Sequence, residues 1–161
     1  MHKDVEVIAT ADVRPLKILC LDPGESTGWV LGTSAHAIRG GTCKRNHLEV
    51  AQLIKDEHPD IIVLERFNLY PGMAKSLAWN SFYPCEVIGV IKYLAMDMNI
   101  PIVEQAPSVK KYAGDIKDRD DWNFVRTRCS GVTEHTKDAY QHYRYFQIHG
   151  LKKLIHDKPP K

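Results

Sequence analysis

The sequence predicts an α/β fold in which a meander of antiparallel strands is followed by parallel strands and helices. Two apolar runs, LKILCLD at 16–22 and DIIVLE at 60–65, are typical of strands that are buried on both faces. A helical pattern over 47–58 separates them and ends at Pro59. Because a strand, a helix and a strand in this order form a right-handed crossover, the two apolar strands should run parallel in one sheet.

The segments on either side of this unit complete the predicted sheet. The turn PGESTG follows the first strand, and WVLGT and AHAIRGGTCKR are then predicted as two further strands of the meander. Residues 74–98 predict a long apolar helix with a break or kink at Pro84, and 100–105 predicts another strand.

The last third of the sequence is predicted to be mainly helical. The stretch 107–131 mixes charge, glycine and aromatic residues, which favours a short helix and a mobile loop. Thr133 is a suitable N-cap for a helix that runs to about His149.

Length and composition favour one globular domain. The chain has 161 residues and a hydrophobic fraction of 43%, which suffices for a sizeable core. We expect an N-terminal extension at 1–15, the folded domain at 16–150 and a basic tail at 151–161. There is no apolar run of about 18 residues and no apolar stretch typical of a secretory signal, so we expect a cytoplasmic protein that does not enter a membrane.

Cysteine spacing and overall charge indicate no particular ligand. The four cysteines contain no CxxC pair, so reduced thiols are expected. The net charge of +2 does not by itself indicate nucleic-acid binding. Basic residues gather late in the chain, at Lys110, Lys111, Lys117, Arg119, Arg126, Arg128, Arg144, Lys152, Lys153, Lys158 and Lys161. Aspartates dilute the first of these groups, so both a solvated surface and a DNA-facing surface remain open.

Acidic residues stand where strands or a helix would present them together. Asp22 and Glu65 end the two apolar strands and should emerge on the same side of the sheet. His135 and Asp138 are three residues apart, which puts them on one face of a helix. Hard divalent ions such as Mg²⁺ prefer carboxylate oxygens and serve phosphoryl chemistry. These four residues therefore predict a metal site and favour a nuclease.

Each of these residues also has a structural interpretation. Asp22 before Pro-Gly is typical of a turn, and Glu65 at a strand end could form a salt bridge. His135 alone is more often a surface residue than a ligand, and Glu134 is an available substitute. Their joint occurrence favours the metal site.

Histidines recur every seven residues at His135, His142, His149 and His156. Neighbours in this series would lie about 10 Å apart along a helix, too far to share a metal ion. Only His135 stands beside an acid in the motif. We therefore expect the others to form a helical stripe of mixed burial.

The order of the elements resembles the ribonuclease H-like fold, a mixed five-stranded sheet flanked by helices. LDPGESTGW resembles the first motif of the RuvC-type Holliday-junction resolvases, IIVLERF the second and HTKDA the last. The segment IPIVEQAPSVKKYAG also resembles the middle part of that family, and the resemblance runs from about Leu16 to Phe146.

This resemblance implies a chemistry and a set of residues. Asp22, Glu65, His135 and Asp138 would bind Mg²⁺, with Mn²⁺ as a substitute, and would be catalytic. Lys110 would lie near the scissile phosphate, with Lys111 and Lys117 as the alternatives.

The resemblance also implies a substrate and an assembly. The substrate would be branched DNA, above all four-way junctions, and Phe67 or Tyr70 would be the aromatic that wedges the junction open. Because a junction has two equivalent scissile strands, a homodimer with two active sites is expected, with helix 74–98 as the best surface for it. Segment 115–131 departs from the family, so substrate preference is not carried over and a phage-type member is one interpretation.

Three alternative functions are weighed against this one. A nuclease acting more broadly on branched DNA or flaps, and a DNA-binding member without catalysis, share the fold, but the full set of acids argues against the latter. An actin-like ATPase also begins with a strand, an aspartate and a Gly-Thr turn. That fold needs a duplicated second half, for which this chain is too short.

Overall fold

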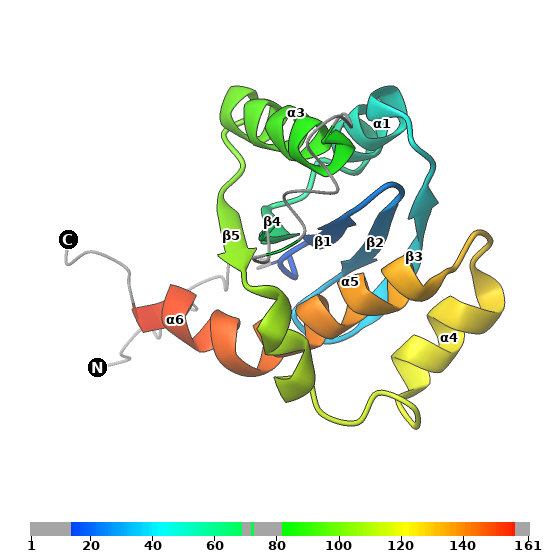
Figure 1. The fold of residues 1–161 in the computed structure, drawn as a ribbon. Coiled ribbons are helices and arrows are strands. Elements are labelled where there is room, and N and C mark those ends of the chain that lie inside the picture. The colour runs from blue at the N-terminus through cyan, green and yellow to red at the C-terminus, as the bar shows by residue number, and fades with distance from the viewer. Residues whose placement is uncertain (1–13, 69–71, 73–81, 157–161) are drawn as a thin grey trace, which may run out of the picture.

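The computed structural model describes residues 14–68, 72 and 82–156 and contains one five-stranded mixed sheet. The strands are β1 (Ile18–Pro23), β2 (Thr27–Gly32), β3 (Ala37–Cys43), β4 (Ile61–Glu65) and β5 (Ile102–Gln105). Their order in the sheet is β3-β2-β1-β4-β5 (Figure 1). The first three strands pair antiparallel, and β1, β4 and β5 pair parallel. The predicted fold class is confirmed.

Helices cover both faces of this sheet. They are α1 (His47–Glu57), α3 (Tyr83–Asp97), the 3₁₀ helix η1 (Pro107–Tyr112), α4 (Asp120–Arg128), α5 (Glu134–Tyr145), the π-helical turn η2 (Phe146–Gly150) and α6 (Leu151–His156). Helices α1 and α3 lie on one face, and α4 and α5 lie on the other (Figure 1).

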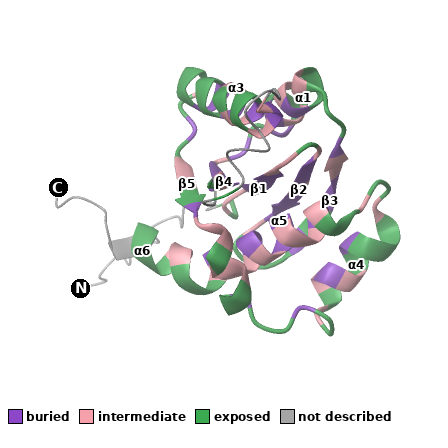
Figure 2. Cartoon of the chain, in the orientation of Figure 1, coloured by how far each residue is buried: buried purple, intermediate pink, exposed green. Residues whose placement is uncertain are grey.

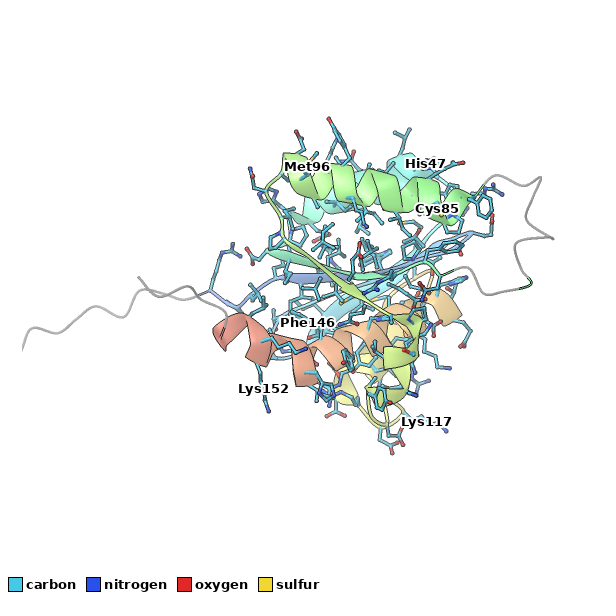
Figure 3. The ribbon with its side chains drawn as sticks, turned by 60° about the vertical axis from the view of Figure 1, so that its left-hand side comes forward. His47, Cys85, Met96, Lys117, Phe146 and Lys152 are labelled. Atoms are coloured by element: carbon cyan, nitrogen blue, oxygen red, sulfur yellow. The ribbon has the colours of Figure 1, made fainter. Side chains whose placement is uncertain are left out.

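Side chains of the central strands alternate between the two faces, as the two-residue period of a strand requires. In β1, Leu19 and Leu21 belong to the core beneath α1 and α3, whereas Ile18 and Cys20 belong to the core beneath α4 and α5. Buried residues accordingly concentrate in the sheet and on the inner sides of the helices (Figure 2). In the side view, Phe146 lies between the sheet and its helix (Figure 3).

Helix α4 packs against the outer strand β3, in the segment that matches no motif. Trp122 and Val125 are the buried residues of α4, so the tryptophan of this helix belongs to the core. Asp121 accepts a hydrogen bond from the backbone of Ala37 at 3.0 Å and another from the Tyr140 hydroxyl at 2.7 Å. The carboxylate of Asp121 therefore ties α4 to both β3 and α5.

One predicted helix boundary differs from the structure, and another lies partly outside the described residues. Pro84 lies in the first turn of α3, where its missing N–H costs no hydrogen bond, and the part of the predicted helix between 73 and 81 is outside the described residues. The helix expected to end near His149 continues through η2 into α6 as far as His156. The first six residues of the predicted tail are thus helical, because the π-helical turn carries the chain on without a break.

Other expectations concern the cysteines and the membrane. Cys20, Cys43, Cys85 and Cys129 are all free thiols, the first two buried and Cys85 exposed. No helix in the described ranges has both the length and the apolar character needed to cross a membrane.

Candidate active site

Three polar side chains form a row along one edge of the sheet, at the carboxyl ends of its parallel strands. In the strand register Leu21 pairs with Leu64 and Glu65 pairs with Gln105, so Asp22, Glu65 and Gln105 follow one another across β1, β4 and β5. By the alternation of each strand they face the α5 side. The prediction that Asp22 and Glu65 emerge on the same side of the sheet is confirmed.

Helix α5 crosses beneath this row and presents three polar residues to it. His135, Asp138 and His142 occupy positions i, i+3 and i+7 and so share one helical face. Thr133 is the N-cap, as the sequence predicts.

The start of α5 is held directly on strand β2. A Cβ atom added at Gly28 would lie 2.0 Å from the backbone oxygen of His135, so only glycine admits the helix at this distance. The Thr136 hydroxyl donates to the Gly41 carbonyl at 2.9 Å and contacts the Thr42 hydroxyl at 2.9 Å. These contacts fix the first turn of α5 and with it the backbone of His135.

The predicted site residues form two sets of contacts, and the charges of Glu65, Lys110 and Asp138 act on Asp22. His135 Nδ1 lies 3.2 Å from Asp22 Oδ2. The Lys110 ammonium, on η1, lies 2.9 Å from Asp138 Oδ2 and 3.1 Å from Glu65 Oε2. The structure therefore brings together all five residues predicted for the site.

Two further residues join the group that sequence analysis did not include. His142 Nε2 lies 2.5 Å from Glu65 Oε2, and His142 Nδ1 lies 2.6 Å from Gln105 Oε1. His142 is fully buried and Gln105 is 5% exposed. The seven-residue histidine spacing was the available signal, because it puts His142 on the same face of α5 as His135, two turns further along.

The electrostatics of the group centre on Asp22. Burial raises the pKa of Asp22 to about 6, and the negative charges of Glu65 and Asp138 act in the same direction. The hydrogen bond with His135 and the charge of Lys110 oppose this rise in pKa. Asp22 is thus the acid whose negative charge is least compensated.

Glu65 and Lys110 have the opposite balance. Burial raises the pKa of Glu65, but hydrogen bonds and charge from His142 and Lys110 outweigh it and lower the pKa below its ordinary value. Burial lowers the pKa of Lys110, but Asp138 and Glu65 outweigh it, so the pKa is raised. Both side chains are therefore charged at neutral pH.

Lys111 and Lys117, the alternatives to Lys110, and Glu134, the alternative to His135, do not contact the acids in any hydrogen bond or ion pair of the described residues. Lys111 lies over the ring of Tyr112, with Nζ 4.9 Å from its centroid, and Lys117 is exposed on the outer surface (Figure 3). Glu134 is exposed and pairs with Lys137 at 3.0 Å.

A cavity of about 200 Å³ opens directly beside Glu65, and it is lined by Pro23, Glu65, Arg66, Phe67, Asn68 and Pro107. Of the two candidates for the junction-wedging aromatic, Phe67 lies here, and Tyr70 is outside the described residues. The cavity provides space next to Glu65 at the end of β4.

A hard divalent ion matches these side chains by chemistry, since carboxylates and an imidazole converge and the charge of Asp22 is only partly compensated. As the side chains are placed, no group of three or more His, Cys, Asp or Glu in the described ranges has the geometry to hold a metal ion. The Lys110 ammonium bridges Glu65 and Asp138 instead. Binding of an ion by the three acids would require Lys110 to move aside.

Solved structures of similar fold include Holliday junction resolvases. RuvC of T. thermophilus, in complex with a Holliday junction substrate, has a TM-score of 0.63 and 14% sequence identity over 85% of this chain and 96% of its own. The fowlpox virus resolvase, in complex with Holliday junction DNA, has a TM-score of 0.55 and 13% identity over 87% of this chain and 99% of its own. The yeast mitochondrial Holliday junction resolvase has a TM-score of 0.53 and 12% identity over 89% of this chain and 82% of its own.

Comparison by sequence gives no such match: no protein-family model and no curated protein matches the chain. At the low identities of the structural neighbours the likeness concerns the fold. The chain therefore has the ribonuclease H-like fold that RuvC shares with other Holliday junction resolvases.

Proposed function

We propose that this protein is a Mg²⁺-dependent, structure-selective endodeoxyribonuclease that resolves four-way DNA junctions by paired nicks. The observation that carries the proposal is the meeting of Asp22, Glu65 and Asp138 with His135 and Lys110 at one edge of the sheet. Acids on two neighbouring strands and on the helix beneath them suit hydrolysis of a phosphodiester. The likeness of the fold to RuvC and two other resolvases supports the choice of substrate.

The side chains would divide the work according to their charge. Asp22, Glu65, Asp138 and His135 would hold Mg²⁺. When bound, the ion would activate a water molecule and stabilise charge on the phosphate and the leaving oxygen. Lys110 would leave its carboxylate partners and turn to the phosphate, where it would neutralise developing charge.

The surroundings of the acids suit a DNA strand. The cavity beside Glu65 has the cation of Arg66, the ring of Phe67 and the amide of Asn68 on its wall. A phosphate could meet the cation, and a base could stack on the ring. Lys111, exposed on η1, adds positive charge near Lys110.

The symmetry of the substrate suggests a homodimer. Two cuts related by a two-fold axis require two sites with the same relation. Helix α3 buries Val87, Ile91 and Leu94 against the sheet but leaves Tyr93 62% exposed and Met96 73% exposed. These two side chains give the helix an outward apolar face on which a second copy could pack.

The experiment is cleavage of a synthetic four-way junction by the purified protein. With Mg²⁺ we expect two symmetrically placed nicks, and with EDTA we expect none. A linear duplex of the same sequence should stay intact, and a flap, a replication fork and an RNA junction measure how broad the activity is. A junction left whole under all divalent-metal conditions would contradict the proposed function.

A further inference from the structure

We propose that His142 and Gln105 are a positioning pair that holds the Glu65 carboxylate in place for catalysis. The inference rests on the proposed function, and it adds two residues to which the sequence analysis assigned no role in the site. Glu65 contacts one ring nitrogen of His142, and Gln105 contacts the other.

The pair contacts Glu65 from the buried side. His142 Nε2 lies 2.5 Å from Glu65 Oε2, while Lys110 Nζ lies 3.1 Å from the same oxygen. The position of Oε2 is thus fixed by two donors, one from α5 and one from η1. The imidazole is fully buried, so this contact is not screened by solvent.

Gln105 in turn holds the imidazole ring. A carboxylate only accepts hydrogen bonds, so His142 Nε2 must be the donor to Glu65. The remaining ring nitrogen, Nδ1, lies 2.6 Å from Gln105 Oε1, so Nδ1 donates to that oxygen or, with the amide turned over, accepts from the Gln105 amide N–H. With both nitrogens engaged, the ring has one orientation, and that orientation aims Nε2 at Glu65.

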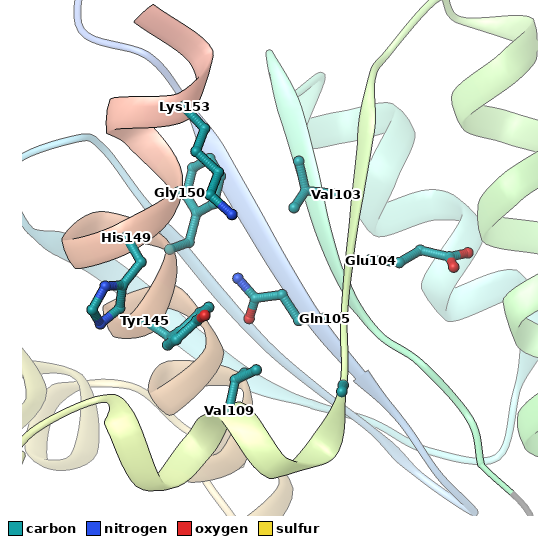
Figure 4. Close-up of a pocket in the computed structure, with 10 residues that line it drawn as sticks. Val103, Glu104, Gln105, Val109, Tyr145, His149, Gly150 and Lys153 are labelled. Carbon is teal, nitrogen blue, oxygen red and sulfur yellow. The ribbon is translucent and has the colours of Figure 1, made fainter. Parts of the chain in front are cut away.

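Gln105 is itself buried at the end of β5. It reaches from β5 toward the helix that carries Tyr145 and His149, at the wall of a cavity of about 190 Å³ (Figure 4). Its own side chain is only 5% exposed despite that cavity. Glu65 and Gln105 are register partners on adjacent strands, so the sheet fixes their separation.

The other anchors of α5 indicate that the pair is not needed merely to dock the helix. Tyr143, next to His142 and equally buried, donates to the Thr33 carbonyl at 2.6 Å. Thr136 bonds to the Gly41 carbonyl at the other end of the helix. Those bonds go to backbone carbonyls, whereas the bond from His142 goes to an acid of the site.

The test compares His142→Leu, His142→Gln and Gln105→Leu in the full chain. We expect His142→Leu to lower kcat for junction cleavage by about 10- to 100-fold, the range usual for residues that orient a catalytic or metal-binding group. KM and junction affinity in EDTA should stay unchanged. His142→Gln keeps an N–H near the position of Nε2 and should restore part of the kcat lost in His142→Leu. The kcat of Gln105→Leu should lie between those of wild type and His142→Leu.

Tyr143→Phe is the matched control, because it removes the hydrogen bonds of the adjacent hydroxyl on α5, which donates to the Thr33 carbonyl and accepts from Gln147 Nε2. We expect it to lower the unfolding temperature and leave kcat unchanged at temperatures where the protein is folded. If the His142 and Gln105 variants behave in the same way, their role is structural and the inference is overturned.

A second measurement does not depend on cleavage. In the metal-free protein we expect a slowly exchanging imidazole N–H proton of His142, far downfield of the backbone amides, that shifts in Glu65→Gln and in Gln105→Leu. Its absence would overturn the pair. A wild-type protein that leaves junctions whole would refute the proposed function, and this signal would then decide alone whether the pair exists.

Discussion

Asp22 is the residue where stability and the proposed function conflict most strongly. It is 5% exposed and faces the negative charges of Glu65 and Asp138. Removing a carboxylate from water into such a place disfavours its charged form. The folded protein therefore keeps an acid that costs stability at neutral pH, which is expected where the acid serves a bound ion.

This conflict predicts a pH dependence of stability in the absence of metal. The pKa of Asp22 is raised to about 6 in the folded state, so the folded state binds the proton more tightly than the unfolded state. The stabilising effect of that proton is complete below the ordinary pKa of an aspartate and is lost as pH rises through about 6. Asp22→Asn should then be more stable than wild type by about 3 kcal/mol at pH 7 in EDTA.

Urea unfolding of both proteins at several pH values measures this difference. The advantage of Asp22→Asn should shrink as pH falls from 7 to 4, because wild type becomes protonated at the same position. An advantage that does not change with pH would contradict the raised pKa of Asp22.

Lys110 is expected to matter more than its neighbour. Lys110→Met keeps most of the side chain but removes the cation that contacts Glu65 and Asp138. We predict that junction cleavage falls by about 10²-fold, the order observed when one charge-stabilising donor is removed. Lys111→Met, whose lysine lies over Tyr112, should cut at nearly the wild-type rate. An equal fall of the cleavage rate in the two variants would mean that each lysine acts only through general electrostatic attraction of the DNA, which contradicts a specific role of Lys110.

The sequence reveals acids more readily than their partners. Asp22 and Glu65 end strands with a strong apolar pattern, and His135 and Asp138 share a helix face, so their meeting can be predicted. His142 was predicted to belong to a stripe of mixed burial because its distance from His135 excludes a shared metal. That distance instead lets each histidine contact a different strand. Gln105 lies in the segment IPIVEQAPSVKKYAG but carries no charge, so only the register of β4 and β5 and its contact with His142 reveal its place.

Helix α5 owes its place to a close approach between backbones. At Gly28 any Cβ would collide with the carbonyl of His135, so Gly28→Ala must push the start of the helix off β2. We predict a loss of unfolding free energy of about 3 kcal/mol, at the upper end for overpacking, and a loss of cleavage larger than stability explains.

Gly89→Ala is the control for this substitution. Gly89 lies in α3, and a Cβ there would meet nothing within 4 Å. Because alanine favours a helix over glycine, we expect stability to rise by about 0.5–1 kcal/mol. Unfolding in urea and junction cleavage should be measured on both variants. A Gly28→Ala protein as stable and active as wild type would contradict the contact between α5 and β2.

The elements themselves follow from short-range patterns to different degrees. The apolar runs of β1 and β4 and the N-cap Thr133 are local signals, and the structure has them where the sequence predicts. The π-helical turn η2, which begins at the buried Phe146, has no such local signal. That is why the predicted helix end at His149 was wrong.

The architecture of the sheet was predictable because strand order and element order are linked. A meander followed by a crossover leaves few arrangements, and the mixed sheet observed is one of them. The substrate is not contained in that order, since one fold serves many functions. Choosing four-way junctions therefore depends on the acids and on the structural neighbours together.

Dimerisation can be tested through helix α3. Tyr93 and Met96 are exposed on it, and a lysine at both positions should prevent a second copy from packing there. We predict that wild type sediments as a dimer and that the double variant sediments as a monomer and makes single nicks. Leu48→Lys, at a position 77% exposed on α1, should remain a dimer. A wild-type monomer that makes paired nicks would exclude this assembly.

The convergence of the acids is tested most directly with a labelled four-way junction in Mg²⁺. Its binding and its cleavage are measured for wild type and for Asp22→Asn. Asn has nearly the same shape as Asp but cannot supply the negative charge, so we predict that the variant binds the junction as tightly as wild type and makes no nicks. A variant that still cuts at the wild-type rate would mean that the edge of the sheet marked by Asp22 is not where the phosphodiester is hydrolysed.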